Sequence, residues 1–205
     1  MSPVSAVWRA ELLSALSEDT LVARTIDGED EAFEEILRRY NKPIYSFIVN
    51  YVGDYDVAQD AFQEALVRAF RNLRKYRLGT NFSAWLHKVA LNASKDCLKK
   101  RYRNQKMEAH ECEDYDPLAL LRDLRPSPEE LLERRELQAV VRKALGLLSS
   151  PHREVILLYQ FQGFSYEEIS RTLSCPLGTV KSRIHYAMRK LEELLRPMAR
   201  EMRLV

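Results

Sequence analysis

Residues 165–184 read SYEEISRTLSCPLGTVKSRI and carry the clearest structural signal in the chain. Ser165, followed three residues later by Glu168, is a capping box, which predicts a short helix over residues 166–173. Residues 174–176, Ser-Cys-Pro, then predict a turn, with the proline suited to the first position of a second helix. The stretch therefore predicts two helices joined by a tight turn.

The second of these helices is strongly amphipathic. Its apolar residues recur every 100° along the helix, and polar and basic residues cover the opposite face. A short helix, a tight turn and a longer helix with a basic outer face predict a DNA-binding helix-turn-helix. The alternative, an ordinary hairpin in a helical bundle, does not explain Thr-Val-Lys-Ser-Arg at the helix start, where hydroxyls and amides can meet phosphates. The predicted DNA face consists of Thr179, Lys181, Ser182, Arg183, His185, Tyr186 and Arg189, and the buried stripe begins with Val180, Ile184, Ala187 and Leu191.

The remainder of the 205-residue chain also predicts helices. Capping residues and apolar residues at helical spacing recur, whereas strand-length alternation does not. Ser17, Asp30 and Asp54 predict three helix starts, and Pro43 predicts a kink or a break in the second of these helices. The expected fold is all-α.

Two interruptions divide the chain. A loop at 77–81 precedes a helix that is expected from about Phe82. Residues 107–130 lose helical periodicity, gain acidic residues and contain three prolines, which predicts a linker. Helices are expected to resume near Leu131. We therefore expect two small helical domains joined by a flexible acidic linker, the second containing the helix-turn-helix.

The net charge of +2 conceals a strong segregation of charge. Residues 1–65 sum to −8, residues 66–106 to +11, residues 107–141 to −6 and residues 142–205 to +5. A merely solvated surface usually mixes both signs. The segregation therefore predicts two surfaces that bind a polyanion such as nucleic acid.

Composition argues against several other classes of protein. Cys97, Cys112 and Cys175 are widely spaced and form no C-x-x-C pair, so they predict reduced thiols rather than disulfides or a zinc site. Neither a secretory signal nor a run long enough to span a membrane is evident, and a cytoplasmic protein is expected. Four scattered histidines, six glycines and no phosphate-binding loop predict no catalytic site, metal or cofactor.

Five stretches together resemble the extracytoplasmic-function (ECF) group of sigma factors, which are initiation subunits of bacterial RNA polymerase in the sigma-70 family. The resemblance covers residues 17–197, with the motifs in the family's order and spacing. The stretches are DAFQEALVRAF at 60–70, FSAWLHKVALN at 82–92, LGLLSSPHRE at 145–154, GFSYEEI at 163–169 and CPLGTVKSRI at 175–184.

The resemblance implies sigma region 2 at 17–106 and sigma region 4 at 138–197. These are flanked by an N-terminal extension at 1–16, a linker at 107–137 and a tail at 198–205. It implies that region 2 contacts the clamp of the largest polymerase subunit and melts the minus-ten element. Region 4 would contact the flap of the second-largest subunit and read the minus-thirty-five element. An anti-sigma factor is the expected regulator.

Particular residues stand at the family's functional positions. Asp60, Gln63 and Glu64 stand where the family binds the clamp. The 77–81 loop, with Phe82, Asn92, Lys95 and Lys99 after it, stands where the family binds the minus-ten strand. The predicted DNA face of the second domain stands on the minus-thirty-five recognition helix, where Tyr186 replaces an arginine common in the family.

Two further functions fit part of the sequence. A helix-turn-helix regulator that acts without polymerase would leave the motifs at 60–92 unexplained. A decoy that only titrates an anti-sigma factor would have no need of Lys181, Arg183 and the basic residues of 66–106. Co-elution of the chain with core polymerase would separate the first alternative from a sigma factor.

Overall fold

The computed structural model describes residues 11–105 and 128–201, and in these ranges every regular element is helical. The prediction of an all-α fold is therefore confirmed. The first part contains α2 (Glu18–Ile26), α3 (Asp30–Val52), α4 (Tyr55–Asn72), the 3₁₀ turn η1 (Leu73–Lys75) and α5 (Phe82–Gln105). The second part contains α6 (Pro128–Gly146), α7 (Ser150–Ile156), the π-helical turn η3 (Leu157–Phe161), α8 (Tyr166–Leu173) and α9 (Leu177–Glu201).

Local capping explains where the first helices begin. Ser17 caps α2 by accepting a hydrogen bond from the Thr20 amide, and Asp54 caps α4 in the same way through the Val57 amide. Gly53 ends α3 in the left-handed region, with φ of 79°, where a residue with a Cβ is strained. The prediction at Asp30 was displaced by one residue, because Glu29 occupies the cap position and makes no side-chain cap bond.

Pro43 lies inside α3, which continues through it to Val52. The expected break at this proline is wrong. Side chains on both sides of it, including Ile36, Ile44 and Phe47, are buried, so packing holds the helix together across the missing backbone bond.

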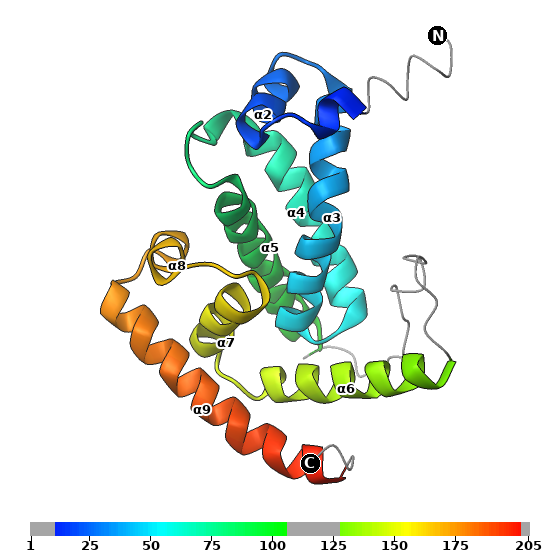
Figure 1. Ribbon diagram of the computed structural model, residues 1–205, viewed down its shortest axis with the longest axis vertical. Helices are drawn as coiled ribbons and strands as arrows, with labels where there is room; N and C mark the ends of the chain where they lie inside the picture. Colours follow the sequence, from blue (N-terminus) through cyan, green and yellow to red (C-terminus); the bar gives the residue numbers. More distant parts are fainter. Residues whose placement is uncertain (1–10, 106–127, 202–205) are drawn as a thin grey trace.

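Helices α2 to α5 form the first domain (Figure 1). The most extensive contact within it joins α4 to α5. Alanines at 58, 61, 65 and 69 of α4 are buried, which lets the two backbones approach closely. Phe70 is exposed and lies edge-on to Phe33 of α3, with 4.9 Å between the ring centroids. The larger buried side chains are Leu21, Ile44, Phe47, Ile48, Phe82 and Leu86.

The described part of the N-terminal extension packs on the first domain. Leu13 is buried, and Arg39 of α3 donates from Nη2 to the carbonyl oxygens of Leu13, Ser14 and Leu16. One guanidinium therefore satisfies the carbonyls at the end of this helical segment. Residues 11–16 are part of the domain's surface structure.

Helices α6 to α9 form the second domain, whose buried apolar side chains are continuous with those of the first domain. Most of the linker expected at 107–137 lies outside the described residues, and α6 already begins within it at Pro128. The buried side chains are Leu145, Ile156, Leu157, Leu158, Ile169, Val180 and Ile184.

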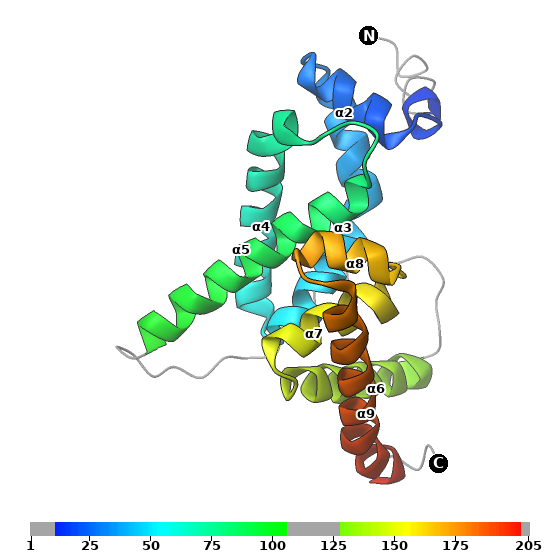
Figure 2. The same ribbon diagram turned by 90° about the vertical axis from the view of Figure 1, so that its left-hand side faces the viewer.

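The two domains are in contact. Helix α8 lies against α5, and the C-terminal half of α3 meets α6 and η3 (Figures 1 and 2). Among the described residues, no helix is both long enough and apolar enough to span a membrane. No group of three potential metal ligands occurs in the same ranges.

Candidate nucleic-acid interface

The helix-turn-helix is formed by α8, the turn at 174–176 and α9. The capping box is present in both directions: Ser165 accepts from the Glu168 amide, and Glu168 accepts from the Ser165 amide at 2.8 Å. Ser174 turns the chain in the left-handed region with φ of 53°. Pro176 was predicted as the first residue of the second helix, but α9 begins one residue later, at Leu177. The Pro176 carbonyl oxygen accepts hydrogen bonds from the amides of Thr179 and Val180 at the start of α9.

The predicted DNA face of α9 is open to solvent. Lys181, Ser182, His185, Tyr186 and Arg189 are exposed, and Thr179 and Arg183 are half-buried. Val180, Ile184 and Ala187 of the predicted stripe are buried, and Leu191 is half-buried. Helix α9 therefore presents a polar, basic surface that is wide enough to meet a groove of duplex DNA.

Tyr186 is the most constrained side chain of this face. Its ring lies 4.3 Å from the His152 ring of α7, and the Arg189 guanidinium lies 5.7 Å from its centre. Burial lowers the pKa of His152, and the nearby Arg183 charge lowers it further. Tyr186 is therefore held in place by α7 as well as by its own helix.

The second candidate surface is the loop at 77–81 with α5 behind it. All five loop residues are exposed. Within the loop, the Thr80 hydroxyl donates a hydrogen bond to the Arg77 carbonyl oxygen at 2.7 Å. Asn81 caps α5 by accepting from the Ala84 amide at 2.9 Å. The loop thus stands out from a domain that fixes both of its ends.

Phe82 is only 1% exposed. Its ring lies 5.2 Å from Tyr76, and Tyr40 and Trp85 each lie 5.5 Å away. The ring has no exposed face on which a base could stack in this arrangement, because the aromatic cluster encloses it. The loop before Phe82, and not the Phe82 ring, is therefore the part of this surface that is open to a base.

The other predicted residues of α5 have different surroundings. Asn92 and Lys99 are exposed, one on each side of Lys95 in the sequence. Lys95 is half-buried, and its Nζ lies 2.8 Å from Glu154 Oε1 on α7. Asn92 and Lys99 are thus available to DNA, whereas Lys95 is engaged by the second domain.

The predicted polymerase contacts lie together on α4. Asp60 and Gln63 are exposed, and Glu64 is half-buried. Glu64 Oε1 accepts from Arg68 Nε at 2.6 Å, and the same guanidinium bonds Asp96 of α5. Asp60 is the more accessible of the two carboxylates in this set.

Polar contacts between the domains were not predicted from the sequence. Asn81 donates to Glu168 Oε1 at 2.5 Å, and Lys88 donates to the Ser174 hydroxyl at 3.1 Å. Arg153 donates to the Tyr51 carbonyl oxygen at 2.6 Å. Nothing local in the sequence pairs these residues, which stand more than 80 positions apart in each case.

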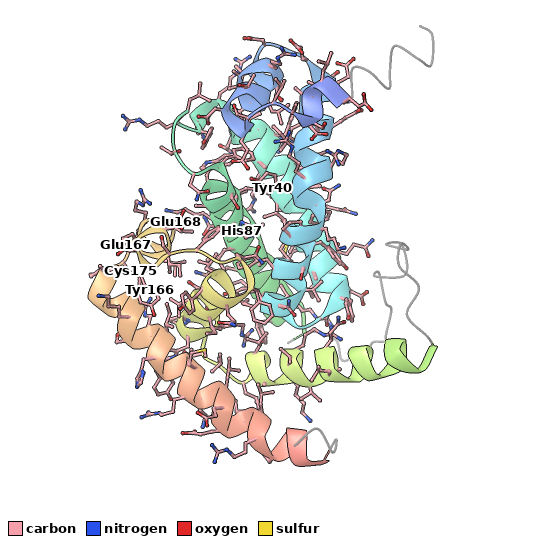
Figure 3. The ribbon with its side chains drawn as sticks, in the orientation of Figure 1. Tyr40, His87, Tyr166, Glu167, Glu168 and Cys175 are labelled. Atoms are coloured by element: carbon pink, nitrogen blue, oxygen red, sulfur yellow. The ribbon has the colours of Figure 1, made fainter. Side chains whose placement is uncertain are left out.

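His87 lies buried at the centre of this contact (Figure 3). Its ring meets Phe47 of α3 and Phe164 of the second domain, each at 5.2 Å. Nδ1 lies 2.8 Å from the Ser83 carbonyl oxygen, and Nε2 lies 3.0 Å from Gln162 Oε1. Burial lowers the pKa of His87, and the hydrogen bonds with Ser83 and Gln162 oppose this shift in part.

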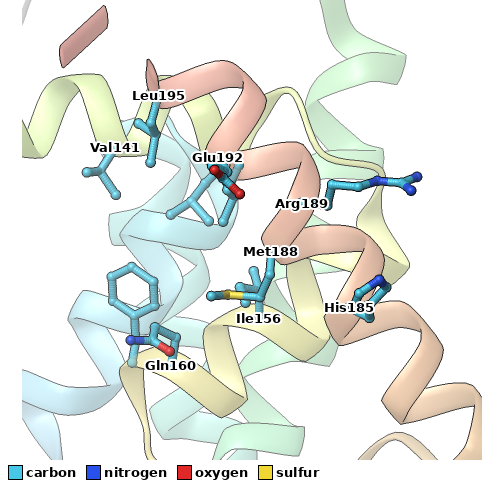
Figure 4. Close-up of a pocket in the computed structure, with 11 residues that line it drawn as sticks. Val141, Ile156, Gln160, His185, Met188, Arg189, Glu192 and Leu195 are labelled. Atoms are coloured by element: carbon cyan, nitrogen blue, oxygen red, sulfur yellow. The ribbon is translucent and has the colours of Figure 1, made fainter. Parts of the chain in front are cut away.

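A groove of about 590 Å³ runs between α6, the α7–η3 segment and α9. Figure 4 shows Met188 beside Ile156, with Val141 and Leu195 towards the other end. Phe161 and Met188, both lining residues, are 43% and 45% exposed. His185 and Arg189 of the predicted DNA face also line the groove, so this apolar surface adjoins the polar one.

The described cysteines, Cys97 and Cys175, are both free thiols. Burial raises the pKa of the Cys97 thiol, and the neighbouring Asp60 and Glu64 carboxylates raise it further. Cys175 is half-buried in the turn of the helix-turn-helix. Cys112 lies outside the described residues.

Two family models match the chain. Sigma-70 region 2 matches residues 36–104, and sigma-70 region 4 matches residues 138–191. The first match contains α4, the loop at 77–81 and most of α5. The second contains the helix-turn-helix and the groove's central part.

Curated relatives match over nearly the whole chain. The RNA polymerase sigma-H factor of Pseudomonas aeruginosa is 34% identical over 193 residues, which cover 93% of this chain and 100% of the relative. The ECF RNA polymerase sigma-E factor of Escherichia coli strain K12 is 32% identical over 188 residues, covering 90% and 97%.

Solved structures share the fold. The sigma factor RpoE in complex with the anti-sigma factor NepR, from Bartonella quintana, is 28% identical with a TM-score of 0.62, covering 80% of this chain and 96% of that one. CnrH in complex with the cytosolic domain of CnrY is 24% identical with a TM-score of 0.63, covering 88% and 97%.

Proposed function

Because this chain belongs to the sigma-70 family, in its ECF group, we propose that it binds core RNA polymerase and directs initiation at promoters with specific minus-ten and minus-thirty-five elements. The family consists of transcription factors rather than enzymes. The observation that supports the proposal is that one chain presents two separate exposed polar surfaces. One is the exposed loop at 77–81 with α5, and the other is the basic face of α9.

The two surfaces suit different forms of DNA. Helix α9 is amphipathic with a polar, basic outer face, and it follows the capped helix α8, an arrangement that suits the major groove of a duplex. The loop at 77–81 is short, exposed and contains Gly79, so it can approach a single base that has left the stack. Exposed Lys99 and Asn92 on α5 can follow the backbone of the displaced strand. An operator-binding regulator would use only the first of these surfaces.

The polymerase contacts that we propose also involve both domains. Asp60, Gln63 and Glu64 of α4 would meet the clamp of the largest subunit. The apolar groove between α6 and α9 would receive the flap of the second-largest subunit, because Phe161 and Met188 leave apolar surface uncovered there. An anti-sigma factor is the proposed regulator, supported by the complex of the RpoE relative with NepR, and the cytoplasm is the proposed compartment.

The test separates strand opening from binding. Asn92→Ala combined with Lys99→Ala removes two exposed α5 side chains that have no role in the contact with the second domain. The double variant should assemble with core polymerase and bind a duplex promoter, but thymine reactivity to permanganate in the minus-ten region should fall. A template with a pre-melted bubble should restore transcription.

Lys190→Ala, which removes a half-buried cation of α9 that pairs with Glu193, is the control on charge. Normal thymine reactivity with the double variant would contradict the assignment of α5 to melting. Failure of the wild-type chain to assemble with core polymerase would contradict the whole proposal.

A further inference from the structure

The loop at 77–81 receives its shape from a residue far away in the sequence. Asp19, in the first turn of α2, accepts a hydrogen bond at Oδ2 from the Gly79 amide at 2.7 Å. Its other oxygen, Oδ1, lies 2.9 Å from the Tyr76 hydroxyl, which also lies 2.5 Å from the Thr80 carbonyl oxygen and is shared between the two. One carboxylate thus holds both the tip of the loop and the residue that precedes it.

Both supports of this arrangement are rigid. Helix α2 is capped by Ser17, and its Leu21 and Val22 are fully buried, so Asp19 stands on a fixed element. Tyr76 is buried, with its ring 5.2 Å from Phe82 and 5.7 Å from Trp85. The Asp19 carboxylate therefore links α2 and Tyr76, which are both anchored in the core, and it fixes the position of the loop relative to them.

The backbone at Gly79 shows why the loop needs such a support. Its φ of 80° lies in the left-handed region, and its amide points to Asp19 instead of to a neighbouring turn. Leu78 and Thr80, on either side of Gly79, remain exposed. Without the bond from Asp19, the flexible glycine would let the tip adopt many conformations.

We propose that Asp19 is a positioning residue for base selection: by fixing the Gly79 amide, it sets the shape of the loop that admits one base of the melted strand. This inference rests on the proposed function and extends it to a residue on α2. A preorganised loop discriminates bases because a wrong base leaves polar groups unpaired, whereas a mobile loop adapts to each base.

The experiment measures base preference with the complete holoenzyme. Holoenzyme assembled from core polymerase and this chain is incubated with a pool of randomised single-stranded DNA, and the bound fraction is sequenced. The wild type should select one base strongly at the position read by the loop. Asp19→Ala should lower that selection about tenfold, while selection at the other positions stays unchanged.

Two variants separate positioning from charge. Asp19→Asn should retain the preference, because its carbonyl oxygen can accept from the Gly79 amide while its NH₂ group donates to Tyr76. Asp27→Ala removes an exposed carboxylate at the opposite end of α2 and should leave the preference unchanged. Equal behaviour of Asp19→Ala and Asp19→Asn would show that charge, and not loop geometry, is responsible.

A folding defect would be recognised by a lowered thermal midpoint of the free chain. In that case Tyr76→Phe, which keeps the buried ring and removes only the hydroxyl, should reproduce the loss at the same position. An unchanged preference in Asp19→Ala, or an equal loss at all positions, overturns the inference. A wild-type holoenzyme that selects no base at all instead overturns the proposed function.

Discussion

The ion pair between Lys95 of α5 and Glu154 of α7 offers the sharpest test of how the two domains meet. Lys95 Nζ lies 2.8 Å from Glu154 Oε1, which also accepts from the Ser150 hydroxyl at 2.8 Å. The Glu154 side chain is 9% exposed and that of Lys95 is 35% exposed. Lys95→Met keeps the aliphatic chain and removes the ammonium, so a nearly buried carboxylate loses its cation.

The expected magnitude lies between two limits. Removing one member of a fully buried pair costs about 3–5 kcal/mol, whereas an exposed pair contributes about 1 kcal/mol or less. Water reaches the ammonium of Lys95 but hardly reaches the carboxylate of Glu154. We therefore expect Lys95→Met to lower the free energy of unfolding by about 1–2 kcal/mol.

A double-mutant cycle with Glu154→Gln isolates the pair. Urea denaturation of the wild type, both single variants and the double variant should give a coupling free energy of about 1 kcal/mol. Lys99→Met, one turn further along α5 and exposed, is the matched control and should change stability little. Effects that add to within about 0.3 kcal/mol would refute the reasoning, because the two side chains would then act independently.

Two further predictions concern single residues. Burial lowers the pKa of His87, so the unfolded chain binds more protons below its usual pKa of about 6.5. The stability that His87 contributes should be complete above that pH and should fall as the pH drops below it, by at most about 1.4 kcal/mol per pH unit. Urea midpoints of the wild type and His87→Gln between pH 5 and 8 would measure this. Curves of midpoint against pH that run parallel for the two proteins would contradict it. Asp54→Ala should lower the free energy of unfolding by about 1–2 kcal/mol through loss of the α4 cap, whereas Asp54→Asn should keep most of that stability. Equal losses for the two variants in urea denaturation would show that the ion pair of Asp54 with Arg101, and not the cap, matters.

Features that depend on a few adjacent residues were predictable from the sequence. Ser17, Asp54 and the Ser165–Glu168 box were predicted as helix caps and serve as caps. The buried stripe of α9 was predicted from periodicity alone. These features share one physical basis, because a cap or an amphipathic face is determined within one or two helical turns.

Features that depend on tertiary packing were predicted less well. The family resemblance placed Phe82 among the residues that bind the minus-ten strand, but the packing of Tyr40, Tyr76 and Trp85 places its ring in the core. Pro43 was expected to kink or break α3, and the helix does not break there, because the buried side chains around it outweigh one missing backbone bond. In both cases the deciding contacts come from other helices.

The contact between the domains bears on the interpretation of the charge pattern. The excess of basic residues in 66–106 was taken as a surface for a polyanion, yet carboxylates of the second domain already meet it. Glu154 binds Lys95, and Glu168 accepts from Asn81 at the edge of the exposed loop. A phosphate at Lys95 would compete with Glu154 for the ammonium, whereas Asn92 and Lys99 are exposed and meet no such competitor. We therefore expect Lys95 to contribute less to DNA binding than its charge suggests as long as α5 and α7 stay in contact.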